Sequence, residues 1–312
     1  MARLSFAHVR SRFWMAACWV SAAVVLAVCA GIVLAMAARG IGALEPSFFT
    51  TDPQPSFEES LAGGIRAPLA GSVILAVSGI LAVFLPSLGA AIYLAEYMDE
   101  QKLGTRAIRL GLEVLAGVPS VVFGFWGLAV FSQPIFAFLS DSAGGDATSA
   151  FGRSFLVGAL VMAVHILPFV VKVMEEAIRA VPRALREAGY ALGLTKWRMI
   201  KRVVLPSAAP GIVTAIVLGL GLIVGDTAIV WLTVGGTMTM SGADAWWLPH
   251  NWLPVLKGTG STLTTFIFYS SPAGEGNAPG KAYGAAFVLL ALVVALNAFV
   301  AWIGRQRSIK AQ

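Results

Sequence analysis

The sequence is poor in charged residues. Asp, Glu, Lys and Arg make up 12% of its 312 residues, whereas about 25% is usual in a soluble globular domain. Hydrophobic residues account for 58% and the mean hydropathy is +0.81. This composition excludes an ordinary soluble domain and predicts a protein that lies in a lipid bilayer.

Cysteines and catalytic motifs are also scarce. Cys18 and Cys29 both lie in the first apolar run, which excludes a disulfide framework. The sequence has no Walker A motif, because Gly280-Lys281 is followed by Ala282 and lacks the upstream glycine. HExxH, paired CxxC and GxSxG motifs are absent as well. We therefore expect no catalytic residue, no metal site and no ATP hydrolysis by this chain itself.

Six long apolar runs are present instead. They cover residues 13–38, 67–94, 107–131, 155–171, 208–234 and 283–303, and about 17–25 residues suffice to cross the hydrocarbon core. We predict an all-α polytopic membrane protein with six transmembrane helices. The first helix (13–38) is followed by an external loop (39–66) and a transmembrane domain of five helices (67–303), with short tails at 1–12 and 304–312.

The basic residues indicate the topology. Three Lys or Arg precede the first run, three lie in 102–109, eight in 172–202 and three in the tail, which is 17 of 22. By the positive-inside rule, both termini and the 173–206 loop face the cytoplasm of a multi-pass inner-membrane protein surrounded by lipid. The net charge of +6 is thus spread along the chain and does not indicate nucleic acid. The first run exceeds the about 7–15 residues of a signal-peptide core, so we expect an uncleaved helix.

The external segments have their own signals. Residues 45–66 are rich in Pro, Ser and acidic residues and show no helical period. The long loop 235–282 carries Trp246, Trp247 and Trp252 with two prolines, which suggests a re-entrant or interfacial stretch over the outer mouth.

The most informative stretch is residues 181–206, VPRALREAGYALGLTKWRMIKRVVLP. Pro182 suits the first position of an amphipathic helix, Gly193 can end it, and a second basic helix follows from Thr195 until Pro206 stops it. Two short helices around a glycine corner suit a protein partner. A helix lying on anionic lipid would also explain the basic residues, but it would not need the glycine spacing.

This stretch resembles the EAA loop of ABC importer permeases, EAA-x3-G-x9-I-x-LP. Gly189 replaces the usual third Ala and Val203 the usual Ile. Three further stretches resemble the permeases of phosphate-specific systems. The loop residues are Glu187, Ala188, Gly189, Gly193, Leu205 and Pro206, and the further stretches are GAAIYLAEY (89–97), LAGVPS with VVFG (115–124) and GDTAIV (225–230).

The resemblance implies the type I permease fold and the import of inorganic phosphate. It also implies partners: a homologous second permease subunit, two cytoplasmic ATPase subunits docked on the loop, and an external phosphate-binding protein. ATP would be used by the ATPase subunits, with no cofactor bound by this chain. Molybdate or sulfate remain alternative substrates. A secondary transporter is the alternative from another class, although few charges lie in the bilayer and no inverted repeat is evident.

Two places along the spans are candidates for the substrate pathway. Pro119, before Ser120 and among several glycines, indicates a broken third span whose freed backbone could line a pathway, although a simple packing kink is as compatible. Asp226, with Thr227, places a carboxylate in the fifth span, where it costs about 2.5–3.5 kcal/mol and is a site candidate. Pairing with a basic group of the neighbouring permease is the structural alternative.

Two details qualify the pathway. The resembled family usually has Glu at position 226 and a basic residue where Leu222 stands, so a cation is missing from the path of an anion. His165, with Pro168, is expected near the cytoplasmic end of the fourth span, where a lone histidine is more often a packing residue than a proton relay.

Overall fold

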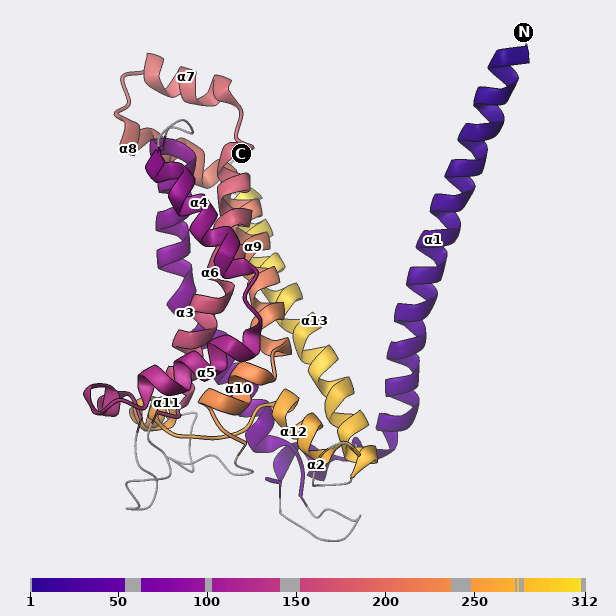
Figure 1. Cartoon of the computed structure of the whole chain (residues 1–312), viewed down its shortest axis with the longest axis vertical. Coiled ribbons are helices and arrows are strands. Elements are labelled where there is room, and N and C mark those ends of the chain that lie inside the picture. The colour runs from indigo at the N-terminus through magenta and orange to yellow at the C-terminus, as the bar shows by residue number, and fades with distance from the viewer. Residues whose placement is uncertain are drawn as a thin grey trace.

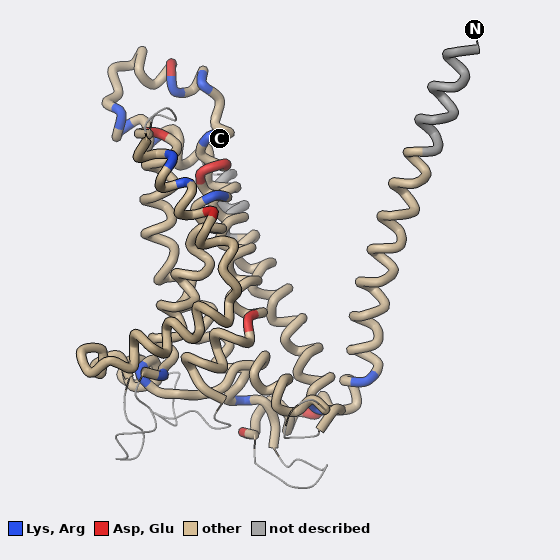
Figure 2. The backbone as a smooth tube through the Cα atoms, viewed as in Figure 1, with Lys and Arg blue, Asp and Glu red and all other residues tan. Residues whose placement is uncertain are grey.

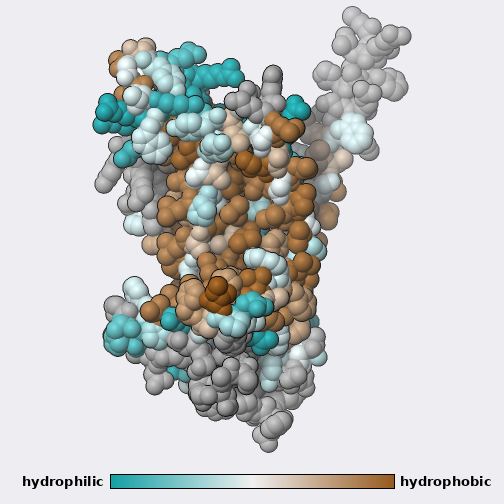
Figure 3. All heavy atoms as spheres, turned by 60° about the vertical axis from the view of Figure 1, so that its left-hand side comes forward, coloured by the Kyte–Doolittle hydropathy of each residue, from teal (hydrophilic) through white to brown (hydrophobic). Residues whose placement is uncertain are grey.

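A computed structural model of the chain describes residues 2–53, 63–98, 103–140, 152–236, 248–272, 274 and 278–309, with side chains from Trp14 to Trp302 except that of Pro249. Within these ranges the regular structure is entirely helical. Charged residues gather toward the two ends of the bundle (Figure 2), and an apolar band lies between the more hydrophilic ends (Figure 3). Five helices are long and apolar enough to cross a membrane, or six if one bent pair is a single span. The all-α polytopic fold is confirmed.

The first helix stands apart from the others. α1 (Ala2–Gly40) leans away from the bundle over most of its length (Figure 1), and Trp19 is 73% exposed. Near its end α1 meets α13 (Pro279–Ile309): the Arg39 guanidinium donates to the Tyr283 hydroxyl at 2.8 Å, and Gly40 lies against the Tyr283 backbone. A short 3₁₀ turn (Ile41–Ala43) follows α1.

The next segment contains a helix that the sequence analysis did not expect. α2 (Pro46–Thr50) begins at Pro46, directly after the extended residue Glu45, and buries Phe48. The interpretation of 45–66 as lacking helical structure is therefore wrong for this turn. Proline at the first helical position and one buried aromatic ring stabilise it, and neither produces a hydrophobic period.

Three helices form the centre of the bundle. α3 (Arg66–Ile92), α6 (Phe155–Arg179) and α9 (Leu205–Gly225) pack against one another. Glycines permit this packing: a Cβ atom on Gly211 would lie 2.3 Å from that of Ala177 in α6. Small residues at such contacts are typical of membrane helices, where close van der Waals packing drives association. Large side chains with at most 2% exposure fill the remaining space: Leu75, Phe155, Met162, Ile166, Met174 and Ile223.

The third apolar run is a broken helix, as predicted. α4 (Leu103–Ala116) and α5 (Ser120–Phe131) are bent by 100° at the break. Pro119 has an extended backbone and caps α5, so it cannot continue α4. α5 packs across α10 (Ala228–Thr233).

The fifth run, expected as one span over 208–234, is also divided. α9 ends at Gly225, Asp226 is extended and α10 starts at Ala228. Asp226 Oδ1 accepts a hydrogen bond from the backbone N–H of Ile229 at 2.8 Å. This bond satisfies one of the amides that a helix start leaves unpaired, which lowers the cost of breaking the helix here.

The two ends of the bundle differ in structure. At one end lie α7 (Arg183–Ala191) and α8 (Lys196–Met199), and at the other α11 (Trp252–Lys257) and α12 (Leu263–Ser270) (Figure 1). We call them the α7 end and the α12 end. Two 3₁₀ segments, Pro134–Leu139 and Pro249–Asn251, are also present. Trp252 is 58% exposed, whereas Trp246 and Trp247 lie outside the described residues, as does the stretch 237–247.

Two boundaries at the α7 end differ from the sequence expectation. α6 continues past residue 171 to Arg179, because its polar residues there form ion pairs. Pro206 does not stop the second basic helix: α8 runs through a π-helical turn (Ile200–Val204) directly into α9. The wider turn accommodates a proline in the second position of α9, where its missing N–H costs little.

Candidate functional site

The first candidate site is the loop at the α7 end. α7 ends in a Schellman motif, in which Leu194 N–H donates to the Gly189 carbonyl at 3.1 Å and Gly193 N–H to the Tyr190 carbonyl at 2.9 Å. Gly193 has a φ of +75°, so any other side chain would be strained there. The glycine corner predicted from the sequence is thus a helix stop that requires glycine.

The EAA-like residues divide between the two sides of α7. Gly189 is buried, and a Cβ atom there would lie 3.3 Å from Met199 Cγ, a tight contact. Glu187 and Ala188 are exposed. This explains the departure from the usual alanine: the helix approaches the second helix of the loop closely at position 189 while presenting Glu187 outward.

Further along, Leu205 is half-buried and Pro206 is exposed at the start of α9. The loop also exposes large apolar side chains among its basic residues. The exposed fractions are 43% for Leu185, 47% for Tyr190, 83% for Leu192 and 56% for Trp197. Clustered apolar side chains rimmed by polar residues mark an interaction surface.

Ion pairs that the sequence analysis missed hold this loop on the bundle. Arg186 donates from Nε and Nη2 to Glu96 Oε1, at 3.1 and 2.9 Å. Glu96 lies in a π-helical turn (Tyr93–Tyr97) that continues α3. The side chains are 17% and 7% exposed. The sequence signal that could have indicated this pair is a carboxylate at the end of an apolar span in a protein with a strongly basic loop.

A second ion-pair group lies beside it. Glu175 Oε1 is 2.6 Å from Arg109 Nη2 and 2.9 Å from Arg179 Nε, so one carboxylate of α6 joins α4 to the end of α6. Arg179 also donates to the Leu94 carbonyl at 3.2 Å. The exposed fraction of the Glu175 side chain is 11%, and those of both arginines are 38%.

The second candidate site is the pair of helix breaks. Gly124 of α5 lies against the backbone of Ala228 and Ile229. Thus α5, which follows the predicted break at Pro119, meets α10, which follows the break at Asp226 that the sequence analysis did not expect. Beside them is an open cavity of about 440 Å³, which is lined by Val121, Phe125, Thr227, Ala228, Trp231, Leu232 and Phe268. Ser120 is half-buried and Pro119 exposed, and neither lines this cavity. Thr227 does line the cavity, together with Val121 from the first turn of α5.

Asp226 lies at this junction. Its carboxylate caps α10 through Oδ1, and its backbone carbonyl accepts from Thr264 Oγ1 of α12 at 3.2 Å. The His165 ring is 5.0 Å from that of Phe123 and sits at the middle of α6, so its predicted place near one end of the span is wrong because α6 is longer than expected. Leu222 is 44% exposed.

Hydroxyl groups surround the start of α12. Thr262 accepts from Thr265 N–H and Thr265 from Thr262 N–H, a reciprocal capping box. Ser72 of α3 accepts from Leu263 N–H at 2.8 Å. These residues are almost fully buried, so the α12 end is joined by hydrogen bonds out of contact with solvent.

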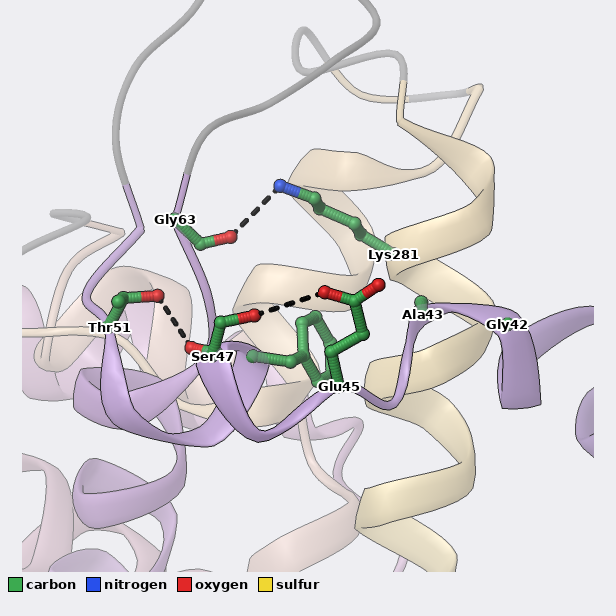
Figure 4. Close-up of a pocket in the computed structure, with 8 residues that line it drawn as sticks. Gly42, Ala43, Glu45, Ser47, Thr51, Gly63 and Lys281 are labelled. Carbon is green, nitrogen blue, oxygen red and sulfur yellow. Dashed lines mark hydrogen bonds between the residues drawn. The ribbon is translucent and has the colours of Figure 1, made fainter.

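A small cavity of about 350 Å³ lies near the start of α13 (Figure 4). Lys281 Nζ donates to the Gly63 carbonyl at 2.9 Å, and Ser47 Oγ donates to Glu45 Oε2 at 3.4 Å. The Lys281 bond ties α13 to the segment that precedes α3, whereas the Ser47 bond lies within that segment. Among the described residues, no group of three or more His, Cys, Asp or Glu side chains could hold a metal ion.

Comparison with known proteins gives one family. Residues 87–309 match the family described as binding-protein-dependent transport system inner membrane component. The chain is 36% identical over 246 residues to the phosphate transport system permease protein PstA 1 of Mycobacterium tuberculosis, covering 78% of this chain and 72% of that protein. It is 30% identical over 285 residues to the probable ABC transporter permease protein YqgI of Bacillus subtilis, covering 91% of each.

Among solved structures, the chain resembles one of the MetNI methionine ABC transporter in an inward-facing conformation. The TM-score is 0.53 at 18% identity, covering 80% of this chain and 95% of that one. At this identity the likeness shows the fold alone.

Proposed function

Because the chain belongs to the family of inner membrane components of binding-protein-dependent transport systems, and is thus a permease subunit of an ABC importer, we propose that it imports inorganic phosphate. The observation that carries this substrate is the 36% identity to a phosphate transport system permease. The family also excludes the secondary transporter considered from the sequence.

The α7 loop is the proposed docking site for a cytoplasmic ATPase. Its exposed apolar side chains, Leu185, Tyr190, Leu192 and Trp197, are set among basic residues, and Glu187 is exposed beside them. Two ATPase subunits would bind and hydrolyse ATP, one on this chain and one on a homologous second permease. The α7 end, both termini included, would then face the cytoplasm, and an external phosphate-binding protein would dock at the α12 end.

Docking at α7 would drive the spans directly. α7 follows α6 along the chain, and α8 continues through the π-turn into α9. A displacement of the loop by closing ATPases would therefore tilt both central helices. Such rigid-body movement around a packed core is the usual way in which a pathway opens alternately to the two sides.

The proposed pathway passes the two helix breaks, with Asp226 and Thr227 from one and Pro119 and Ser120 from the other. One Asp226 oxygen caps α10, and Oδ2 has no hydrogen bond to the described residues. A carboxylate oxygen can accept a hydrogen bond from a protonated phosphate oxygen, which fully ionised sulfate cannot offer. This would give selectivity for phosphate at neutral pH.

Another oxyanion, molybdate or sulfate, is the second candidate substrate. Leu222 favours it, because an exposed apolar side chain stands where the resembled phosphate permeases commonly have a cation. The second permease would supply that cation if phosphate is the substrate.

The test is uptake of labelled phosphate into vesicles that contain this chain with its neighbouring permease, ATPase and binding protein. We expect ATP-dependent uptake that unlabelled phosphate blocks and a tenfold excess of sulfate or molybdate leaves unchanged. ATP-dependent uptake of sulfate or molybdate in place of phosphate would overturn the substrate and leave the importer in place.

A further inference from the structure

Three basic side chains from three successive helices converge on the Tyr93–Tyr97 π-turn. Arg179 of α6 donates to the Leu94 carbonyl at 3.2 Å, and Arg186 of α7 holds the Glu96 carboxylate. Lys196 of α8 places its ammonium 4.4 Å from the centre of the Tyr97 ring, a cation–π contact. α6, α7 and α8 thus all contact one five-residue turn at the end of α3.

Arg186 is the centre of this arrangement. Besides Glu96, its guanidinium donates to the carbonyl of Ile178 at 2.8 Å and to that of Val181. A guanidinium has five N–H groups in a fixed plane, which lets one side chain serve several acceptors at set angles. Arg186 therefore joins the end of α6, the start of α7 and the π-turn.

The burial of Glu96 makes this contact specific. Its side chain is 7% exposed, and a buried carboxylate is stable only where charged or hydrogen-bonded partners replace water. π-helical turns are rare and tend to occur at functional sites. α7 otherwise packs on α8 and on the Ile200–Val204 turn of its own loop.

We infer that Glu96 is a positioning residue that makes α3 move together with the α7 docking helix. This inference rests on the proposed docking of an ATPase at α7. Because α3 packs along both α6 and α9, a loop that holds α3 as well would move the three central helices as one body. Without the Glu96 contact, movement of α7 would reach α3 only indirectly, through the packing of α3 on α6 and α9 and through the contacts of Arg179 and Lys196 with the π-turn.

The inference is tested first by a distance measurement that does not depend on the substrate. Spin labels are placed at Ala184→Cys in α7 and Tyr93→Cys in the π-turn, both exposed positions, after Cys18 and Cys29 are replaced by serine. Pulsed EPR is recorded on the assembled complex with and without ATP and vanadate. We expect one narrow distance that is the same in both states, and a broadened distribution in Glu96→Gln.

Either of two results would overturn the inference. One is a nucleotide-dependent change of that distance in the otherwise native chain, because α7 would then move relative to α3. The other is a Glu96→Gln distribution as narrow as that of the parent.

The second test compares transport with ATP hydrolysis. In Glu96→Gln the ATPase subunits should still co-purify, while phosphate uptake per ATP hydrolysed falls about fivefold or more, the scale of a modest coupling between sites. Glu96→Asp, which keeps the charge, should retain part of the coupling. The matched control is Glu176→Gln, an exposed carboxylate of α6, which should behave as the parent.

The outcomes separate this inference from the proposed function. Parental uptake per ATP in Glu96→Gln would refute the role of Glu96 and leave the importer intact. If the parent complex takes up no phosphate at all, the proposed substrate fails, and the EPR distances still decide on Glu96.

Discussion

The two ends of the bundle are held together by different kinds of contact. At the α7 end, buried or half-buried ion pairs join helices that are distant in sequence: Arg186 with Glu96, and Glu175 with Arg109 and Arg179. At the α12 end the buried contacts are hydrogen bonds of hydroxyl groups with the backbone, such as Ser72 with Leu263.

The two ends also differ in how far water reaches their ion pairs. An ion pair of the α12 end, Arg66 with Asp52, lies at the surface, where such a pair contributes about 0–1 kcal/mol. The buried Glu96 pair at the α7 end cannot exchange its partner for water. The α7 end can therefore transmit force as a unit, whereas the break beside Asp226 is held by a hydroxyl bond, from Thr264 Oγ1 to the Asp226 carbonyl at 3.2 Å.

The largest expected effect on transport function comes from removing the glycine corner at the α7 end. Gly193→Leu forces a side chain into the left-handed region, which costs about 1–2 kcal/mol and disrupts the Schellman motif. We expect ATPase association about 5- to 30-fold weaker, since 1.4 kcal/mol is a factor of ten. Co-purification measures it. Parental association together with parental uptake would contradict the role of the loop.

The ion pairs of the α7 end are tested by Glu175→Gln. The neutral amide leaves Arg109 and Arg179 without their shared charge partner, and we expect a loss of about 1–3 kcal/mol of stability. The loss stays below that of a fully buried pair because both arginines reach water. Thermal unfolding in detergent measures it, with Glu176→Gln as the control. Equal unfolding midpoints for Glu175→Gln and Glu176→Gln would mean that the ion pairs do not stabilise the α7 end.

The hydroxyl contacts of the α12 end are tested by Ser154→Ala. Ser154 caps α6 by accepting from Val157 N–H at 3.0 Å, and it donates to the Leu139 carbonyl at 2.9 Å. We expect a loss of about 0.5–2 kcal/mol, seen as faster amide exchange in the first turn of α6. Ser207→Ala, an exposed serine at the α7 end, is the control. Unchanged exchange near Val157 would show that the cap is dispensable.

The smallest expected effect is that of Gly189→Ala, which restores the residue usual in EAA loops. The new methyl group would lie 3.3 Å from Cγ of the buried Met199, which must shift slightly, while alanine favours the helix over glycine by about 1 kcal/mol. The two effects offset each other, so ATPase association should stay near the parental level. A loss of ATPase association as large as that in Gly193→Leu would mean that close packing at position 189 is as important for docking as the backbone conformation at Gly193.

Local signals in the sequence predicted much of this structure. The apolar runs predicted the spans, Pro119 predicted the broken third span, and Gly193 predicted the end of α7. The continuation of a helix through Pro206 was not predictable, because the π-turn that accommodates the proline has no simple period. The Arg186–Glu96 pair joins residues 90 positions apart, and such pairing becomes visible when the fold brings α3 to α7.

We propose above that the α7 end couples ATP hydrolysis to movement of the central helices, and that the helix breaks near Asp226 select the anion. The most direct measurement compares Asp226→Asn with Gly193→Leu for ATPase association, ATP hydrolysis and phosphate uptake in the same vesicles. Asparagine can still cap α10 through its side-chain oxygen, so Asp226→Asn changes charge with little change of structure. We predict that Asp226→Asn keeps association and hydrolysis but loses phosphate uptake or its selectivity over sulfate, whereas Gly193→Leu loses association, hydrolysis and uptake together. Normal uptake and selectivity in Asp226→Asn would contradict the account.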